Sequence, residues 1–78
     1  MHEVGVAKEV LALCLEKAQG KQISHIKVKL GNDGHTTAES FKLAFNMVAR
    51  GTVAQSARLQ IIKGVDLESS VIDLEVEV

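Results

Sequence analysis

The sequence contains no proline, tryptophan or tyrosine, and its 78 residues include one cysteine and two phenylalanines. The single cysteine, Cys14, excludes an intrachain disulfide and a zinc site built from several thiolates. The 9 basic and 10 acidic residues nearly balance, so the charge gives no sign of a nucleic-acid partner. No apolar run approaches the roughly 18 residues of a membrane span, and the signature of a signal peptide is missing. We therefore expect one cytoplasmic domain, residues 1–78, with an aliphatic core, no nucleic-acid partner and no membrane contact.

The first segment with a clear period runs from Glu3 to about Gln19, where apolar residues recur at helical spacing. Gly20 supplies the residue expected just past a helix C-terminus. Cys14 falls on the apolar stripe, where a free cysteine behaves as a small hydrophobe, so we predict a core residue and not a nucleophile. The predicted buried stripe consists of Val4, Ala7, Leu11, Cys14 and Ala18, widened by Val10 and Leu15.

From Ile23 to Leu30 the period changes to strict alternation, which predicts a strand with one dry and one wet face. The predicted dry face carries Ser24, Ile26, Val28 and Leu30, and the wet face carries His25, Lys27 and Lys29. His25 is expected to point to solvent with the lysines.

A turn-rich loop, residues 31–35, follows this strand and lacks the lysine and spacing of a P-loop. Thr36 and Glu39 have the spacing of a capping box ahead of a second helix, which Gly51 ends. His35, just before the cap, is expected either to support a ligand residue from behind or to lie at the surface. The predicted buried face of this helix consists of Ala38, Phe41, Ala44, Phe45 and Val48.

Two further strands are predicted, Leu59 to Ile62 and Val71 to Val78. In the last one Ile72, Leu74, Val76 and Val78 are expected inward, and Asp73, Glu75 and Glu77 outward. The fold class is α/β, with two helices packed on one face of a three-stranded mixed sheet in the order helix-strand-helix-strand-strand. The first two strands can be parallel across the helix between them. The lysines of the first strand complement the acids of the third, so these two strands are predicted to be neighbours.

The chain begins Met1-His2-Glu3, which brings three nitrogens together: the α-amine, the His2 amide and the His2 imidazole. One cation held by these nitrogens closes two fused chelate rings that tend toward a plane. A planar nitrogen site suits Ni(II) or Cu(II), whereas Zn(II) prefers a tetrahedron. The alternative reading is a frayed histidine followed by a glutamate that is favourable at a helix start.

Four stretches together resemble the hydrogenase nickel-incorporation metallochaperones: Met1-His2-Glu3 with its helix, residues 26–31, residues 38–45, and Gly51-Thr52 with the final strand. The resemblance implies that Ni(II) is bound by the amine of Met1, the imidazole of His2 and nearby backbone amides. Glu3 would add its amide or an assisting carboxylate. It also implies an accessory maturation GTPase and a hydrogenase large subunit as partners.

Two departures from that family pattern stand out. Members normally carry a zinc module with two Cys-x-x-Cys pairs between the last two strands, where this chain has only Gly64 to Ser70. No zinc is therefore expected, whether the short form is natural or the module has been removed. The loop 32–35 also differs, which affects any partner contact made there.

Two functions stay open at this stage. The leading hypothesis is a nickel-binding metallochaperone domain that delivers Ni(II) for maturation of a nickel enzyme, hydrogenase being favoured. The alternative is an interaction module of the same fold without a metal function. An enzyme is not expected, because the sequence has no Ser/His/Asp or Cys/His set and no carboxylate pair outside the wet strand face.

Overall fold

The computed structural model describes residues 2–34 and 36–77, with only the backbone of His2. Met1, His35 and Val78, to which the sequence assigned roles, lie outside the described residues. The elements follow the predicted order: α1 (His2–Ala18), β1 (Ile23–Leu30), α2 (Ala38–Val48), β2 (Arg58–Lys63) and β3 (Ser70–Val76). None of the described helices is long and apolar enough to cross a bilayer.

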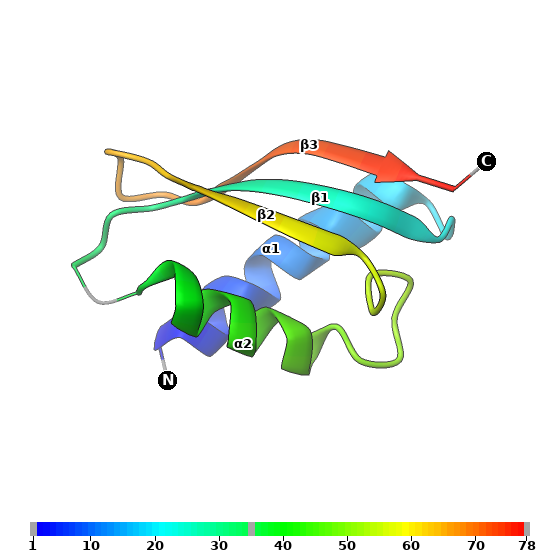
Figure 1. Ribbon diagram of the computed structural model, residues 1–78, viewed down its shortest axis with the longest axis horizontal. Helices are drawn as coiled ribbons and strands as arrows, with labels where there is room; N and C mark the ends of the chain where they lie inside the picture. The colour runs from blue at the N-terminus through cyan, green and yellow to red at the C-terminus, as the bar shows by residue number, and fades with distance from the viewer. Residues whose placement is uncertain (1, 35, 78) are drawn as a thin grey trace.

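The three strands form one sheet in the order β2-β1-β3, with β1 in the centre (Figure 1). β1 pairs parallel with β2 and antiparallel with β3. Both helices lie on the same face of the sheet (Figure 1). The predicted mixed sheet, the shared helix layer and the pairing of the first and third strands are all confirmed.

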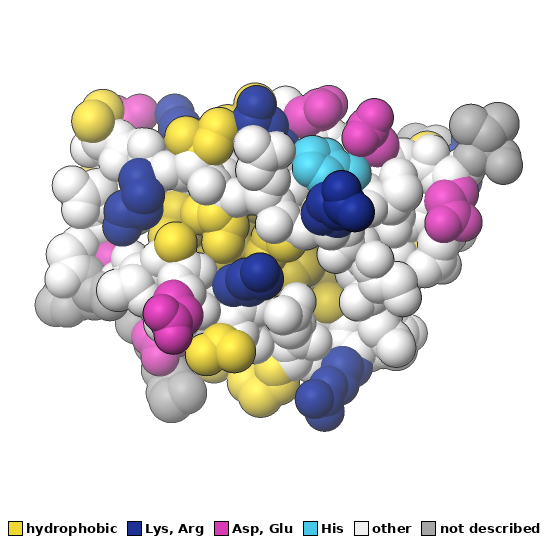
Figure 2. All heavy atoms as spheres, in the orientation of Figure 1, with side chains coloured by type: hydrophobic (Ala, Val, Ile, Leu, Met, Phe, Trp, Pro, Cys, Tyr) yellow, Lys and Arg dark blue, Asp and Glu magenta, His cyan; other side chains and the backbone are white. Residues whose placement is uncertain are grey.

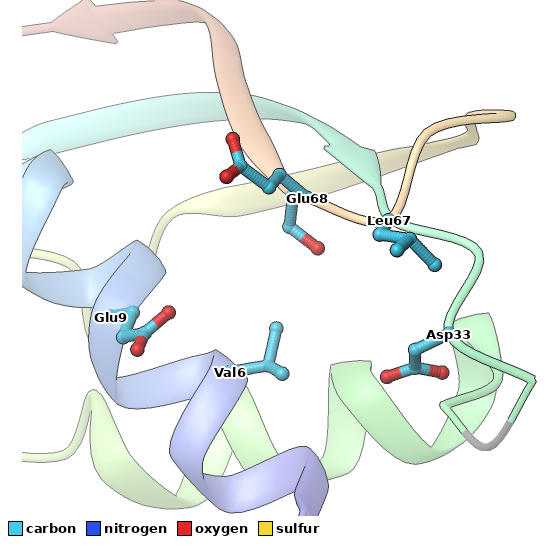
Figure 3. Close-up of a pocket in the computed structure, with 6 residues that line it drawn as sticks. Val6, Glu9, Asp33, Leu67 and Glu68 are labelled. Carbon is cyan, nitrogen blue, oxygen red and sulfur yellow. The ribbon is translucent and has the colours of Figure 1, made fainter.

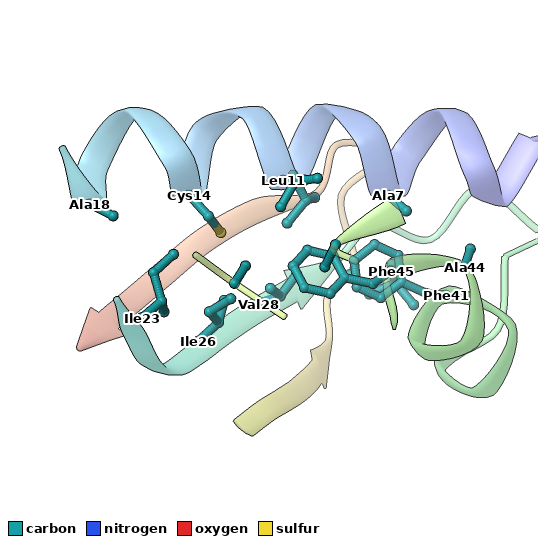
Figure 4. Close-up of a cluster of buried hydrophobic side chains, with 14 residues drawn as sticks. Ala7, Leu11, Cys14, Ala18, Ile23, Ile26, Val28, Phe41, Ala44 and Phe45 are labelled. Carbon is teal, nitrogen blue, oxygen red and sulfur yellow. The ribbon is translucent and has the colours of Figure 1, made fainter. Parts of the chain in front are cut away.

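The core lies between α1, α2 and the inner face of β1. Figure 4 shows Ala7, Leu11 and Cys14 of α1 pointing toward the strand residues, with the two aromatic rings of α2 filling the other end. The ring centroids of Phe41 and Phe45 are 5.9 Å apart. The predicted faces of α1 and α2 do pack on this core, with Val4, Leu15, Ala38 and Val48 only partly buried at its edge. The largest fully buried side chains are Phe41, Phe45, Ile23, Ile26, Leu30, Val10, Val28 and Cys14.

Two inward assignments are wrong, and irregular pairing with β3 explains both. Ile23, 1% exposed, takes the inward place near the start of β1, while Ser24 is exposed and its hydroxyl donates to the carbonyl of Glu75 (3.2 Å). Ile72 was predicted inward and is 50% exposed, because Val71 is the residue opposite Val28. The register of β3 shifts at both places, and a shift of one residue moves side chains to the other face.

The predicted capping box is also displaced by one residue. Thr37 caps α2: its hydroxyl accepts from the Ser40 amide (3.0 Å), and the Ser40 hydroxyl accepts from the Thr37 amide (3.1 Å). Thr36 is instead buried, and its amide and hydroxyl each donate to a carboxylate oxygen of Asp33 at 2.7 Å. Glu39 lies in the first turn of α2. Its negative charge is favourable at the positive end of the helix dipole, but its side chain does not take part in the cap.

The connection between β2 and β3 folds back onto the end of β1. The Gly64 amide donates to the carbonyl of Leu30 (2.9 Å), and the Asn32 amide donates to the carbonyl of Asp66 (2.7 Å). The Gly31 amide donates to the hydroxyl of Ser69 (2.8 Å). This short connection is therefore tied to the end of β1 by hydrogen bonds, although the side chains of residues 65–68 are exposed.

Charged side chains line the outer face of the sheet (Figure 2). Lys27 lies opposite Asp73 in the register, as the charge pattern predicted. Lys29 lies opposite Ser70, and its ammonium group is 3.5 Å from the carboxylate of Asp66 in the β2–β3 connection. The partner of Lys29 is therefore an acid of the connection and not of β3.

Candidate metal centre

Of the predicted metal-binding residues, Glu3 and the backbone of His2 stand at the start of α1. Met1 and the imidazole of His2 are not among the described atoms, so the ligand geometry proposed from sequence stays a prediction. The backbone of His2 and Glu3 belongs to the first turn of α1. The first four N–H groups of a helix have no acceptor within the helix. An amide that binds a metal must lose its proton, and these amides can do so without breaking a helix hydrogen bond.

Glu3 is the one predicted ligand residue whose side chain is described. It is half-buried and lines a groove of about 240 Å³ between α1 and α2. Its charge lies at the positive end of the helix dipole, where a carboxylate is favourable and a cation is not. Glu3 thus offsets part of the repulsion that a divalent ion would meet there. The other groove residues are Val4, Ser40, Leu43, Ala44 and Met47.

A larger hollow, about 510 Å³, lies between α1 and the two loops at the far end of β1 (Figure 3). Three carboxylates line it: Glu9, Asp33 and Glu68. The Asp33 carboxylate already accepts two hydrogen bonds from Thr36, and Figure 3 shows the Glu68 carboxylate turned away from Asp33. The hollow is therefore acidic without forming a ligand set.

The remaining side chains suited to metals are dispersed. Within residues 2–34 and 36–77, no three or more His, Cys, Asp or Glu side chains are grouped closely enough to hold an ion. His25 is half-buried, less exposed than the sequence predicted, and its Nδ1 lies 3.6 Å from a Glu75 carboxylate oxygen, a distance too long for a hydrogen bond.

Cys14 is buried in the core, as predicted. Burial raises the pKa of its thiol from 9.0 to about 11, and nearby Lys17 opposes part of that rise. The thiolate is the form that binds metals and attacks electrophiles. The neutral, buried thiol of Cys14 is therefore a packing group.

The sequence did not reveal the apolar groove beside Glu3. Leu43 and Met47 lie off the buried face of α2, so the helical periodicity alone assigns them to ordinary surface positions. A sequence signal did exist, since two large apolar residues four apart on an exposed helix face form a contiguous stripe. Only the packing of α2 against α1 shows that this stripe lies next to the predicted metal-binding end.

Several known proteins are similar to this chain in sequence. Residues 1–68 match the family described as hydrogenase/urease nickel incorporation, metallochaperone, HypA. The hydrogenase maturation factor HypA of Methylocella silvestris is 36% identical in an alignment of 64 residues that covers 78% of this chain and 57% of that protein. The corresponding factor of Rippkaea orientalis is 30% identical over 63 residues, 81% of this chain and 55% of that protein. The chain thus spans about half the length of these curated relatives.

Solved structures agree on the fold. The solution structure of the nickel metallochaperone HypA from Helicobacter pylori superimposes with a TM-score of 0.78 at 18% identity, covering 95% of this chain and 96% of that one. A second solution structure of a HypA protein gives a TM-score of 0.74 at 22% identity, covering 99% and 97%. At these identities the likeness establishes a shared fold only. Family membership is shown by the match of residues 1–68 to the family. The chain therefore belongs to the hydrogenase/urease nickel-incorporation family HypA, a family of metallochaperones and not of enzymes.

Proposed function

We propose that this domain binds Ni(II) as cargo at Met1, His2 and Glu3 and delivers it for maturation of a nickel enzyme, hydrogenase being favoured. The observation that carries the proposal is that the family match begins at residue 1 and so includes the Met-His-Glu start. The family's own description names nickel incorporation into hydrogenase or urease.

The chemistry of the proposed site follows from its donors. The α-amine supplies one nitrogen, the His2 imidazole a second, and the amides of His2 and Glu3 complete a planar set that suits Ni(II). The amine titrates near pH ~8 and histidine near pH ~6.5 in model peptides, so both lose protons before they bind. Binding therefore releases protons and strengthens as the pH rises.

The fold supports delivery as well as binding. α1 is anchored along its length by core residues such as Ala7, Val10 and Cys14, so the proposed site is presented at the end of a rigid element. A planar centre also leaves positions above and below the plane for the ligands of an acceptor. The cargo can then pass to a partner while the domain stays folded.

The partners proposed from the family relationship are an accessory maturation GTPase and the hydrogenase large subunit, all in the cytoplasm. The chain spans only about half the length of its curated relatives. We expect no zinc in this domain, since Cys14 is its single cysteine.

The test is a nickel titration of protein with a native, untagged N-terminus. His2→Ala should weaken Ni(II) binding by at least ~100-fold, since even second-shell changes cost 10–100-fold. A tag that blocks the amine should have the same effect. His25→Ala is the matched control and should bind nickel as the parent does, while Glu3→Ala should retain a planar, diamagnetic Ni(II) spectrum. If His2→Ala binds as tightly as the parent, the site lies elsewhere and the interaction-module function replaces this proposal.

A further inference from the structure

β2 forms one edge of the sheet. In the strand order β2-β1-β3 of the described residues, β2 pairs with β1 and has no strand on its other side. The amide of Gly64, directly after β2, donates to the carbonyl of Leu30 in β1. Backbone groups of successive strand residues point to opposite sides of the strand. Leu59, Ile61 and Lys63 therefore direct their N–H and C=O groups away from β1, and such a row can pair with a strand of another chain.

The side chains at this edge are basic. β1 and β2 contain Lys27, Lys29, Arg58 and Lys63 and no acidic residue, whereas β3 contains acidic residues and no basic one. On the face drawn in Figure 2, acidic side chains gather along β3, and basic side chains lie along β1 and β2. Arg58 and Lys63 are exposed and form no ion pair with any other described residue. The free edge of the sheet thus carries positive charge without an acidic partner.

The pairing of β3 with β1 shows which kind of strand this sheet accepts beside basic residues. Asp73 lies opposite Lys27 on the outer face, while the next residue, Leu74, packs against the core. β2 offers the same arrangement on its free side, because Leu59 packs against the core and its neighbour Arg58 is exposed. A strand that alternates acidic and apolar residues would match both faces of β2.

We propose that the free edge of β2 is a docking site for an extended segment of a partner protein in which acidic and apolar residues alternate. The segment adds a further strand to the sheet through backbone hydrogen bonds to Leu59, Ile61 and Lys63. Its acidic side chains lie on the outer face near Arg58. Its apolar side chains continue the half-buried row of Leu59 and Ile61.

The charge of the surroundings selects the occupant. Charged side chains on an edge strand hinder pairing with unrelated strands, and the charges of β1 and β2 have one sign. α2 also contacts β2, and α2 with the residue two places after it adds Lys42 and Arg50 against one acid, Glu39. The edge therefore repels a basic strand and attracts an acidic one, and such attraction also speeds the encounter.

A second copy of this chain is the main competing occupant, because the outer edge of its β3 is acidic as well. That contact would be head-to-tail, with the β2 edge of one copy on the β3 edge of the next. A head-to-tail contact that does not close continues into a filament. A partner segment instead covers the β2 edge in a single binding event, so we assign the edge to it.

The first test follows the backbone amide NMR signals of the untagged, metal-free chain during titration with a capped heptapeptide of alternating glutamate and valine. The signals of Leu59, Ile61 and Lys63 should shift and their amides should exchange more slowly with solvent, whereas the signals of β3 should stay in place. A heptapeptide with lysine in place of glutamate should shift none of them. The glutamate–valine peptide with every inner backbone nitrogen methylated keeps its charge and should bind at least tenfold more weakly, because it cannot pair as a strand.

Charge reversal is the second test. Arg58→Glu/Lys63→Glu should weaken binding of the glutamate–valine peptide at least tenfold, and added salt should weaken its binding to the parent. Lys8→Glu/Lys17→Glu is the matched control, since it makes the same change in net charge at exposed residues of α1. This control should bind the peptide within about threefold of the parent. Circular dichroism checks that both double variants fold.

Four outcomes would each overturn the proposal: no shift in β2 at saturating peptide, equal binding of the methylated peptide, equal loss of binding in the two double variants, or a largest shift in β3. Signals of β2 that move with protein concentration before peptide is added would also overturn it, because the occupant would then be a second copy. No step involves nickel, so the outcome is separate from that of the proposed function.

Discussion

Gly31 offers a direct test of how the β2–β3 connection is packed. Gly31 is buried at the end of β1, and a Cβ added there would overlap the carbonyl oxygen of Leu67 and approach a Glu68 backbone carbon to 2.9 Å. Because the obstacles are backbone atoms, a side chain cannot simply rotate away. Gly31→Ala should therefore displace the whole connection from β1.

The magnitude follows from the contacts that the displacement breaks. The hydrogen bonds Gly31 N–Ser69 Oγ (2.8 Å) and Asn32 N–Asp66 O (2.7 Å) would be lost. Each contributes a net ~0.5–1.5 kcal/mol, and replacing glycine with alanine returns roughly 0.4–1 kcal/mol by restricting the unfolded chain. The free energy of unfolding should therefore fall by about 1.3 kcal/mol at the middle of these ranges, and by about 2.6 kcal/mol at most.

Urea and thermal denaturation followed by circular dichroism would measure this change. For a domain of this size, 1 kcal/mol shifts Tm by roughly 4–8 °C. Gly5→Ala is the matched control, because nothing lies within 4 Å of an added Cβ at this α1 position and alanine is the better helix former by ~0.8–1 kcal/mol. The two variants should shift Tm in opposite directions. A Gly31→Ala protein that melts at or above the parent's Tm would refute the packing described for the connection.

Three further predictions concern the core, the sheet surface and the buried thiol. Phe45→Ala should cost roughly 3–5 kcal/mol, near the whole margin of so small a domain, whereas a metal chelator should leave the melting curve unchanged; a normal melt for Phe45→Ala would contradict the core assignment. Lys29→Glu should destabilise by less than about 1 kcal/mol through repulsion with Asp66, and Lys29→Glu/Asp66→Lys should recover that loss; an effect that persists in high salt would exclude this pairing. The raised pKa of Cys14, about 11 instead of 9.0, means that its contribution to stability is fully present below pH ~9 and is lost as the pH rises through the folded value. Thiol titration at pH ~8 should detect Cys14 only after denaturation, and comparison of alkaline unfolding with Cys14→Ala checks the pH window.

Helix and strand order could be predicted because periodicity is a local property of the sequence. Details that depend on pairing could not. Val71 and Ile72 are both apolar, so nothing in the sequence shows that a bulge turns Ile72 outward. Thr36 and Thr37 are both capable caps, and the choice depends on Asp33, which holds Thr36 by two hydrogen bonds.

Part of the candidate site could also be predicted from a local motif, and part of it depends on packing. Met1, His2 and Glu3 form a contiguous motif, so the chelate could be proposed from sequence alone. The surroundings of Glu3 depend on the contact between α1 and α2, which no short motif encodes. Leu43 and Met47 are some forty residues away in the chain and become its neighbours only through that packing.

The short β2–β3 connection explains how this domain can share a fold with longer relatives. β3 needs only to return antiparallel beside β1, and the entropy of closing a flexible loop grows slowly, by about 0.6 kcal/mol for each doubling of its length. A six-residue turn and a whole inserted module are therefore both compatible with the same three-stranded sheet. The connection faces α1 across the hollow lined by Val6 and Leu67 (Figure 3), one to two turns from the proposed nickel ligands. An insertion at this place would lie near the end of α1 at which we propose nickel binding, while the core stays the same.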